Sequence, residues 1–165
     1  MKDAYVIGSM CVVAIVIGAL LYVYGPSITL PGHVGGSAST MLMQGDDAKT
    51  SDRTNYRVTS ADELSSLWLL IYGGSGPAAP TVDFSKNEVL AVFDGSHGTG
   101  GYAVKVTNVV DSGLSRTVTV EHDTPGKGCV VSDAVTSPYE VVLVSKMQDN
   151  ATLSHTDVEK TVDCK

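Results

Sequence analysis

The chain has 165 residues, enough for one compact domain and an additional segment. It carries 11 basic and 18 acidic side chains, a formal net charge of -7. This balance argues against nucleic acid as a partner, because nucleic-acid-binding proteins need a basic patch against the phosphates. The 17 glycines and the low aromatic content of 6% favour a small β-rich domain with many turns.

The chain begins with a long apolar segment. Residues 5–24 contain no charged side chain, and a helix needs about 20 such residues to cross a bilayer. Gly25 and Pro26 then end the helix. We predict a transmembrane anchor at residues 1–25. A cleaved signal peptide is the alternative, but the apolar run is longer than the usual core of about 7–15 residues and no Ala-x-Ala site follows.

The basic residues near this segment predict its orientation. Lys2 precedes the span, and the next lysine or arginine is Lys49. The positive-inside rule therefore places the N-terminus in the cytoplasm. We expect a single-pass protein of the cell membrane whose C-terminal domain lies outside the cytoplasm.

A flexible linker is predicted for residues 26–54, which are rich in Gly, Ser, Pro and Thr and show no sustained apolar period. The domain follows at residues 55–165, with a short edge strand at Tyr56 and Val58. Ser60 and Glu63 then form a capping box at the start of a helix. Gly73 ends that helix, and Trp68 on its apolar face is expected in the core.

The remainder of the domain reads as strands. Short apolar or alternating runs occur at residues 89–93, 102–107, 117–122 and 139–144, with a weaker one around residues 158–162, and a hairpin turn is expected at residues 111–113. The predicted fold class is α+β: a small, mostly antiparallel β barrel or sandwich with one N-terminal helix, preceded by a single transmembrane helix.

A glycine-rich loop at residues 95–102 separates two of these strands. Its sequence, Gly-Ser-His-Gly-Thr-Gly-Gly-Tyr, has four glycines in eight residues, more than a tight turn requires. It lacks the Gly-Lys-Ser/Thr ending of a phosphate-binding loop and the G-x-S-x-G motif of a nucleophile elbow. Two interpretations remain open: a recognition loop presented by a rigid sheet, or a corner that only shapes the fold.

The four histidines are the residues that could take part in catalysis or bind a metal. His33 lies in the linker, and His155 lies in a polar segment where a solvated role is expected. His122 is flanked by acidic residues, but neighbours on a strand point to opposite faces and do not share a metal. His97 lies in the glycine loop. We therefore predict no catalytic residue, no metal site and no cofactor. An enzyme would need these histidines and carboxylates to converge, which a large separation of His97 and His122 would rule out.

Cys129 and Cys164 are the two cysteines of the domain, and neither belongs to a C-x-x-C pair. If the domain lies outside the cytoplasm, a disulfide between them is expected. Two separate thiols are expected if the predicted topology is wrong.

Several segments of the domain resemble the C-terminal domain of the PrcB family, described as protease-complex subunits. They are Trp68 and residues 80–84, 99–102, 125–126 and 136–139. The resemblance implies a non-catalytic, extracytoplasmic protein-binding module that associates with a surface protease as a stabilising subunit of its complex. PrcB itself resembles a lipoprotein, whereas this chain has no lipid-box cysteine.

A second, weaker resemblance is to chagasin-like cysteine protease inhibitors, through Thr-Gly-Gly-Tyr at residues 99–102. The Asn-Pro before that loop and the later Arg-x-Pro-Trp are missing. It implies, as the alternative function, a protease inhibitor that uses the same loop. Under both resemblances the candidate partner-binding residues are His97, Thr99, Gly100, Gly101 and Tyr102.

Overall fold

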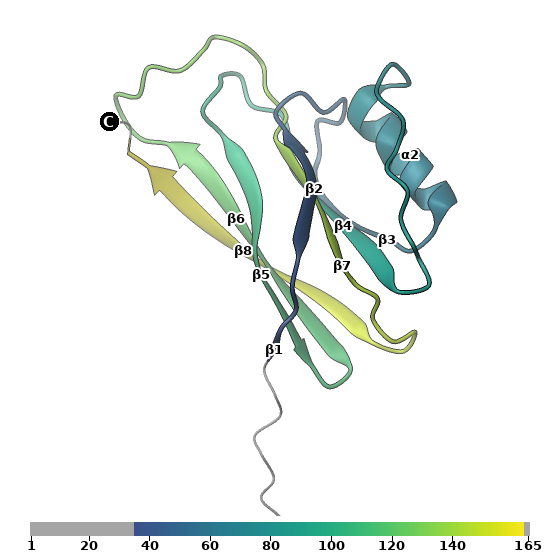
Figure 1. Cartoon of the computed structure of the whole chain (residues 1–165). Helices are drawn as coiled ribbons and strands as arrows, with labels where there is room; N and C mark the ends of the chain where they lie inside the picture. The colour runs from purple at the N-terminus through teal and green to yellow at the C-terminus, as the bar shows by residue number, and fades with distance from the viewer. Residues whose placement is uncertain (1–34, 164–165) are drawn as a thin grey trace, which may run out of the picture. The chain divides into compact units, whose positions relative to one another are not determined.

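The computed structural model describes residues 35–163 (Figure 1). The predicted transmembrane anchor at residues 1–25, and residues 26–34 of the predicted linker, lie outside the described residues. Across residues 35–163, no helix combines the length and the apolar character that crossing a membrane requires.

The described part forms eight strands and one helix, arranged in two sheets. In one sheet the order is β1-β5-β6-β8, and in the other it is β2-β7-β4-β3. All neighbours are antiparallel except β6 and β8, which are parallel. In chain order the elements are β1 (Gly35–Gly36), β2 (Thr40–Gly45), β3 (Arg53–Val58), α2 (Ala61–Tyr72), β4 (Asn87–Asp94), β5 (Ala103–Ser112), β6 (Ser115–Pro125), β7 (Tyr139–Ser145) and β8 (Thr152–Val162).

The helix follows from its caps as predicted. The Ser60 side chain accepts a hydrogen bond from the Glu63 backbone N–H at 3.3 Å, and Gly73 ends the helix in the left-handed conformation at φ 65°. The Glu63 carboxylate reaches back to the backbone N–H of Thr59 at 2.6 Å rather than to that of Ser60. Trp68 is only 7% exposed, and its indole N–H donates to the Pro77 carbonyl at 3.0 Å. Its predicted place in the core is confirmed.

The β2-β7-β4-β3 sheet forms a middle layer, with α2 on one face and the other sheet on the opposite face (Figure 1). Alternate residues of β4 serve the two sides: Val89 and Phe93 pack with the helix, whereas Leu90 and Val92 pack against β5 and β6. Both sides of β4 are therefore buried. The two sheets stay separate in the described part, so the sandwich prediction is confirmed and the barrel alternative is wrong.

Strand β2 differs from the prediction of a flexible linker over residues 26–54. Thr40 pairs with Leu143 of β7, and Gly45 pairs with Tyr139. The strand was missed because it lies at a sheet edge, where its side chains are only partly buried, and because its partner lies far along the chain. The compact unit therefore begins well before residue 55.

Candidate functional site

The glycine loop connects β4 to β5 and is attached to the connection between β6 and β7. His97 and Thr136 exchange two backbone hydrogen bonds, of 2.8 and 3.0 Å. The Gly100 N–H donates to the Ser132 carbonyl at 2.9 Å, and the Thr136 hydroxyl donates to the Thr99 carbonyl at 2.8 Å. These bonds fix the glycine loop against the β6–β7 loop, so both loops present one surface at the same end of the domain.

Two of the glycines are explained by this attachment. Gly101 has φ +91°, and a Cβ there would lie 2.8 Å from Cγ1 of Val131. A Cβ on Gly100 would lie 2.5 Å from the Ser132 hydroxyl oxygen, an atom that a side-chain rotation can move. Gly98, in contrast, is exposed and a Cβ there would meet nothing within 4 Å. Packing within the chain thus accounts for Gly101 but not for Gly98.

The side chains of His97 and Tyr102 stack face to face across the loop. Their ring centroids are 3.7 Å apart and the planes differ by 5°. Both residues are partly exposed, and the His97 side chain retains 24% of its accessible surface. Tyr102 is therefore stacked and partly exposed, whereas Val104, two residues further along, is buried.

His97 also caps a buried polar cluster around Asp94, the last residue of β4. Its Nε2 lies 2.7 Å from Oδ2 of Asp94, and Nδ1 of His122 contacts the other carboxylate oxygen. Arg53 Nε lies 3.6 Å from the same oxygen. Nε2 of His122 lies 3.4 Å from the Asp157 carboxylate on β8. The condition set for an enzyme is therefore met in part, because His97 and His122 converge on one carboxylate. Within residues 35–163, no three His, Cys, Asp or Glu side chains are placed to hold a metal ion.

The prediction for His155 is wrong. This side chain is half-buried on β8, and its Nε2 is buried without a hydrogen-bond partner in the described part of the chain. Burial lowers the pKa of His155, although the charge of Asp157 acts in the opposite direction. Side chains alternate between the two faces of β8, and His155 lies on the face that is directed toward the other sheet. The polar residues around it in the sequence did not indicate this position.

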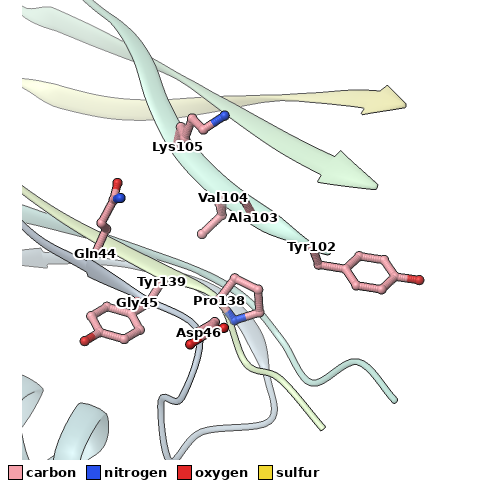
Figure 2. Close-up of a pocket in the computed structure, with 9 residues that line it drawn as sticks. All are labelled: Gln44, Gly45, Asp46, Tyr102, Ala103, Val104, Lys105, Pro138 and Tyr139. Carbon is pink, nitrogen blue, oxygen red and sulfur yellow. The ribbon is translucent and has the colours of Figure 1, made fainter. Parts of the chain in front are cut away.

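A cleft of about 270 Å³ lies beside the glycine loop, where the two sheets separate. Its polar lining includes Gln44 of β2, Asp46 directly after β2, and Lys105 of β5. Figure 2 shows Tyr102 at one rim, with its ring directed away from Tyr139. The lining is mixed polar and apolar, which suits a contact with a polypeptide better than a dedicated small-molecule pocket.

The β6–β7 loop carries the apolar side chains that sequence reasoning missed. Val130 is fully exposed and Val135 is 74% exposed. Both lie in the segment that the glycine loop holds in place through Ser132 and Thr136. We define the loop face as the glycine loop together with Val130 and Val135. The sequence did contain an indication of this exposure. Valines in a turn-rich segment without helical or strand periodicity have no regular element that would direct them into the core.

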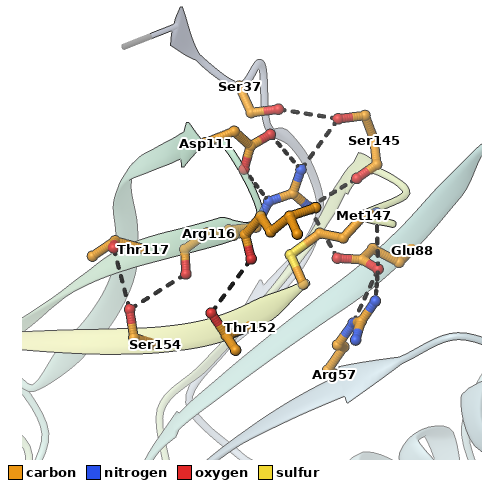
Figure 3. Close-up of polar contacts among 11 residues, drawn as sticks. Ser37, Arg57, Glu88, Asp111, Arg116, Thr117, Ser145, Met147, Thr152 and Ser154 are labelled. Atoms are coloured by element: carbon orange, nitrogen blue, oxygen red, sulfur yellow. Dashed lines mark hydrogen bonds and ion pairs between the residues drawn. The ribbon is translucent and has the colours of Figure 1, made fainter. Parts of the chain in front are cut away.

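Charged residues are also buried at the opposite end of the domain (Figure 3). Arg116 is 1% exposed and donates to Glu88 Oε1 at 2.9 Å, to both carboxylate oxygens of Asp111 at 2.6 and 2.7 Å, and to the Ser145 carbonyl at 2.8 Å. Arg57 donates to the other Glu88 oxygen at 2.8 Å. The hydrogen bonds from Arg116 lower the pKa of Asp111. Every group is paired, which is typical of a structural cluster.

Of the two cysteines predicted to form a disulfide, Cys129 lies in the β6–β7 loop and Cys164 lies outside the described residues. Cys129 Sγ is 3.8 Å from the Val162 carbonyl, near the end of β8. This position brings Cys129 close to the segment that precedes Cys164. The disulfide stays a prediction.

The fold and the loop face together describe a β-sandwich domain with one covering helix and exposed loops at one end. Residues 89–145 match the family model described as PrcB C-terminal. This match confirms the resemblance predicted from the sequence over residues 89–145, whereas Trp68 and residues 80–84 lie outside it. No curated protein and no solved structure matches the chain.

The family match covers a defined part of the architecture. It includes β4 from Val89 onward, then β5, β6 and β7. These are the two central strands of each sheet, and they include the glycine loop and the β6–β7 loop. The helix and the four edge strands lie outside the match. The loop face therefore lies within the segment that matches the family model.

Proposed function

We propose that the chain is a membrane-anchored, extracytoplasmic protein-binding module that serves as a non-catalytic subunit or stabiliser of a surface protease complex. The observation that carries this proposal is the loop face, where Val130 and Val135 are exposed on a backbone that hydrogen bonds hold in place. Exposed apolar side chains on a fixed surface favour protein contact, because their burial in an interface releases water. The match to the PrcB family supports a protease as the partner.

The candidate residues of the glycine loop take different roles in this proposal. His97 and Tyr102 supply a stacked, partly exposed aromatic surface for the partner. Thr99, Gly100 and Gly101 shape the loop through their bonds and close approach to residues 131–136. A substitution at Gly101 would therefore disturb the domain itself and would not isolate a binding defect.

The test is a pull-down from detergent-solubilised membranes of the source cells, with the full chain as bait and protease activity measured in the eluate. The variant Val130→Asp/Val135→Asp places charge on the loop face. Leu114→Asp is the matched control, because Leu114 is 46% exposed in the hairpin between β5 and β6 at the other end of the domain. We expect the intact chain and the control to recover protease activity, and the double variant to lose at least tenfold.

Equal recovery by all three baits would place the contact away from the loop face. Absence of protease activity from every eluate would contradict the protease partner. The inhibitor alternative makes a different prediction in the same assay: adding purified chain to the recovered protease would lower its turnover, and Val130→Asp/Val135→Asp would relieve that effect.

The anchor and the disulfide are tested together by labelling thiols in intact cells with a membrane-impermeant maleimide. We expect Cys129 and Cys164 to react only after reduction, because both would lie outside the cytoplasm and form a disulfide. The loop-entropy relation gives such a cross-link about 3–4 kcal/mol of stabilisation. Labelling without reduction would contradict the disulfide, and labelling only after lysis would contradict the proposed orientation.

A further inference from the structure

An apolar groove of about 480 Å³ lies between strand β3 and helix α2, apart from the loop face. Its walls come from alternate residues of β3, Tyr56 and Val58, and from Leu67 and Leu70 of the helix. Tyr56 remains 38% exposed and Leu70 is only partly buried. The groove therefore exposes apolar surface that neither sheet nor helix covers within the described residues.

Strand β3 is the last strand of its sheet in the described part of the chain. One of its edges pairs with β4 in continuous register from Arg53 to Val58, and within residues 35–163 no strand lies beside its other edge. An open edge presents backbone N–H and C=O groups to which a further strand can pair. The groove runs beside this edge, on the face of the sheet that α2 covers.

The other edge strands of the two sheets carry features that discourage pairing. β2 has a register shift between Met41 and Met43, and β1 has two residues. β8 presents Asp157, Glu159 and Lys160 within a short stretch. Natural proteins use bulges, short strands and charges in this way to protect exposed edges. β3 also carries two charges, but Arg53 and Arg57 alternate with the groove residues and pair with Glu159 and Glu88. Its register is unbroken and it lies next to an apolar groove, so it is the edge best suited to accept a strand.

The groove also has a charged rim. Asp62 and Glu63, in the first turn of α2, line it together with Ser66. Hydrogen bonds from Thr59 lower the pKa of Glu63, against a smaller opposing effect of burial, so this carboxylate is ionised at neutral pH. Both acidic residues are exposed at the same wall. This rim complements a basic side chain and repels an acidic one.

We propose that this groove binds an extended segment of a partner protein, which adds to the edge of β3 as a further strand. Alternate side chains of such a strand point to the same face as Tyr56 and Val58, so apolar residues at every second position enter the groove. A lysine or arginine of the segment lies against Asp62 and Glu63. This site is independent of the loop face and of the protease partner.

The structure provides a closely matched pair of variants for testing this site. Ser65 and Ser66 are adjacent and exposed on α2, and each donates its hydroxyl to the carbonyl four residues earlier, at 2.9 and 3.0 Å. Ser66 lines the groove, whereas Ser65 faces a different hollow of the helix surface. Ser66→Trp would fill the groove, and Ser65→Trp would make the same chemical change outside it.

The experiment selects binders from a random heptapeptide library displayed on phage, with the full chain in detergent micelles as the target. We expect enrichment of peptides with alternating apolar residues and a lysine or arginine. A synthetic peptide of the enriched sequence should bind Ser65→Trp like the unaltered chain and bind Ser66→Trp at least tenfold more weakly. Hydrogen exchange should then show new protection of backbone amides in β3.

Three results would overturn the proposal. The first is no enrichment, or enrichment of peptides that lack alternating apolar residues with a lysine or arginine. The second is an equal affinity of the peptide for both tryptophan variants. The third is binding without protection in β3, which would indicate an apolar pocket rather than strand addition. Concentration-dependent dimerisation that Ser66→Trp abolishes would instead assign the groove to a second copy of this chain. Loss of protease recovery in the pull-down has no bearing on any of these outcomes.

Discussion

The layer between the two sheets buries charged side chains at both of its ends, but the two ends use different chemistry. Glu88 is the second residue of β4 and Asp94 is its last, and their even spacing directs both toward the second sheet. Arg116 and His122 occupy the corresponding positions of β6 and pair with Glu88 and Asp94 respectively. Apolar residues of both strands fill the space between the two pairs.

The difference lies in the chemical group that meets the buried carboxylate at each end. Arg116 keeps its charge at every pH that proteins experience. Its N–H groups donate to three carboxylate oxygen atoms and to one backbone carbonyl oxygen. At the other end Asp94 is bonded by the imidazoles of His97 and His122, and the Arg53 guanidinium lies farther away, at 3.6 Å. The guanidinium end therefore fixes the sandwich, and the imidazole end lies beside the glycine loop.

The largest effect is expected from Arg116→Met. It leaves Glu88, which is fully buried, with Arg57 as its remaining cationic partner and removes both bonds to Asp111. Loss of one member of a buried ion pair costs about 3–5 kcal/mol of unfolding free energy. Urea unfolding in detergent measures the loss. The double variant Glu88→Leu/Arg116→Met should lose less, and an equal or greater loss would show that the charges themselves do not dominate.

An intermediate effect is expected at the imidazole end. His122→Ala removes a buried partner of Asp94 and should cost about 1–3 kcal/mol, the range for leaving a buried polar group unsatisfied. His97→Ala should cost less than 1 kcal/mol, because this side chain is partly exposed and water can replace it. Thermal unfolding of both variants provides the comparison. Equal losses would mean that the loop contact is as important to the fold as the buried one.

The smallest effect concerns the pH dependence of stability. Burial raises the pKa of Glu140, against the opposing effects of the Val106 N–H and of Lys105. The ionised form is therefore disfavoured in the fold, and the contribution of Glu140 to stability is lost as the pH rises from its ordinary pKa of 4.5 through the raised value. Glu140→Gln should gain stability relative to the unaltered chain over that interval.

Asp111, at the guanidinium end, contributes to the pH dependence of stability in the opposite direction. Its lowered pKa means that its contribution is present above the ordinary value of 3.8 and is lost as the pH falls through the lowered value. Asp111→Asn should therefore flatten the acid side of the stability profile, whereas Glu140→Gln should flatten the side above it. For each variant, the stability difference from the unaltered chain is measured as a function of pH. Differences that change in the same direction with rising pH for both variants would contradict this assignment.

Much of the fold could be predicted because its signals are local. The cap at Ser60, the burial of Trp68 and the strands around residues 89–93 and 139–144 depend on neighbours within a few positions. Strand β2 and the parallel pairing of β8 could not be predicted, because their partners are set by the topology. The cluster at Asp94 has the same origin, since His97 and His122 meet only when a loop closes over one sheet and the second sheet packs against it.

The pairing of β2 with β7 also bears on how the chain is made. Thr40 emerges from the ribosome well before its partner Leu143, and β1 likewise waits for Val110. The middle sheet cannot be completed until β7 has been made, so β2 stays unpaired until then. If the domain is exported, this delay keeps it unfolded and suited to threading through a translocation channel, and assembly follows on the far side.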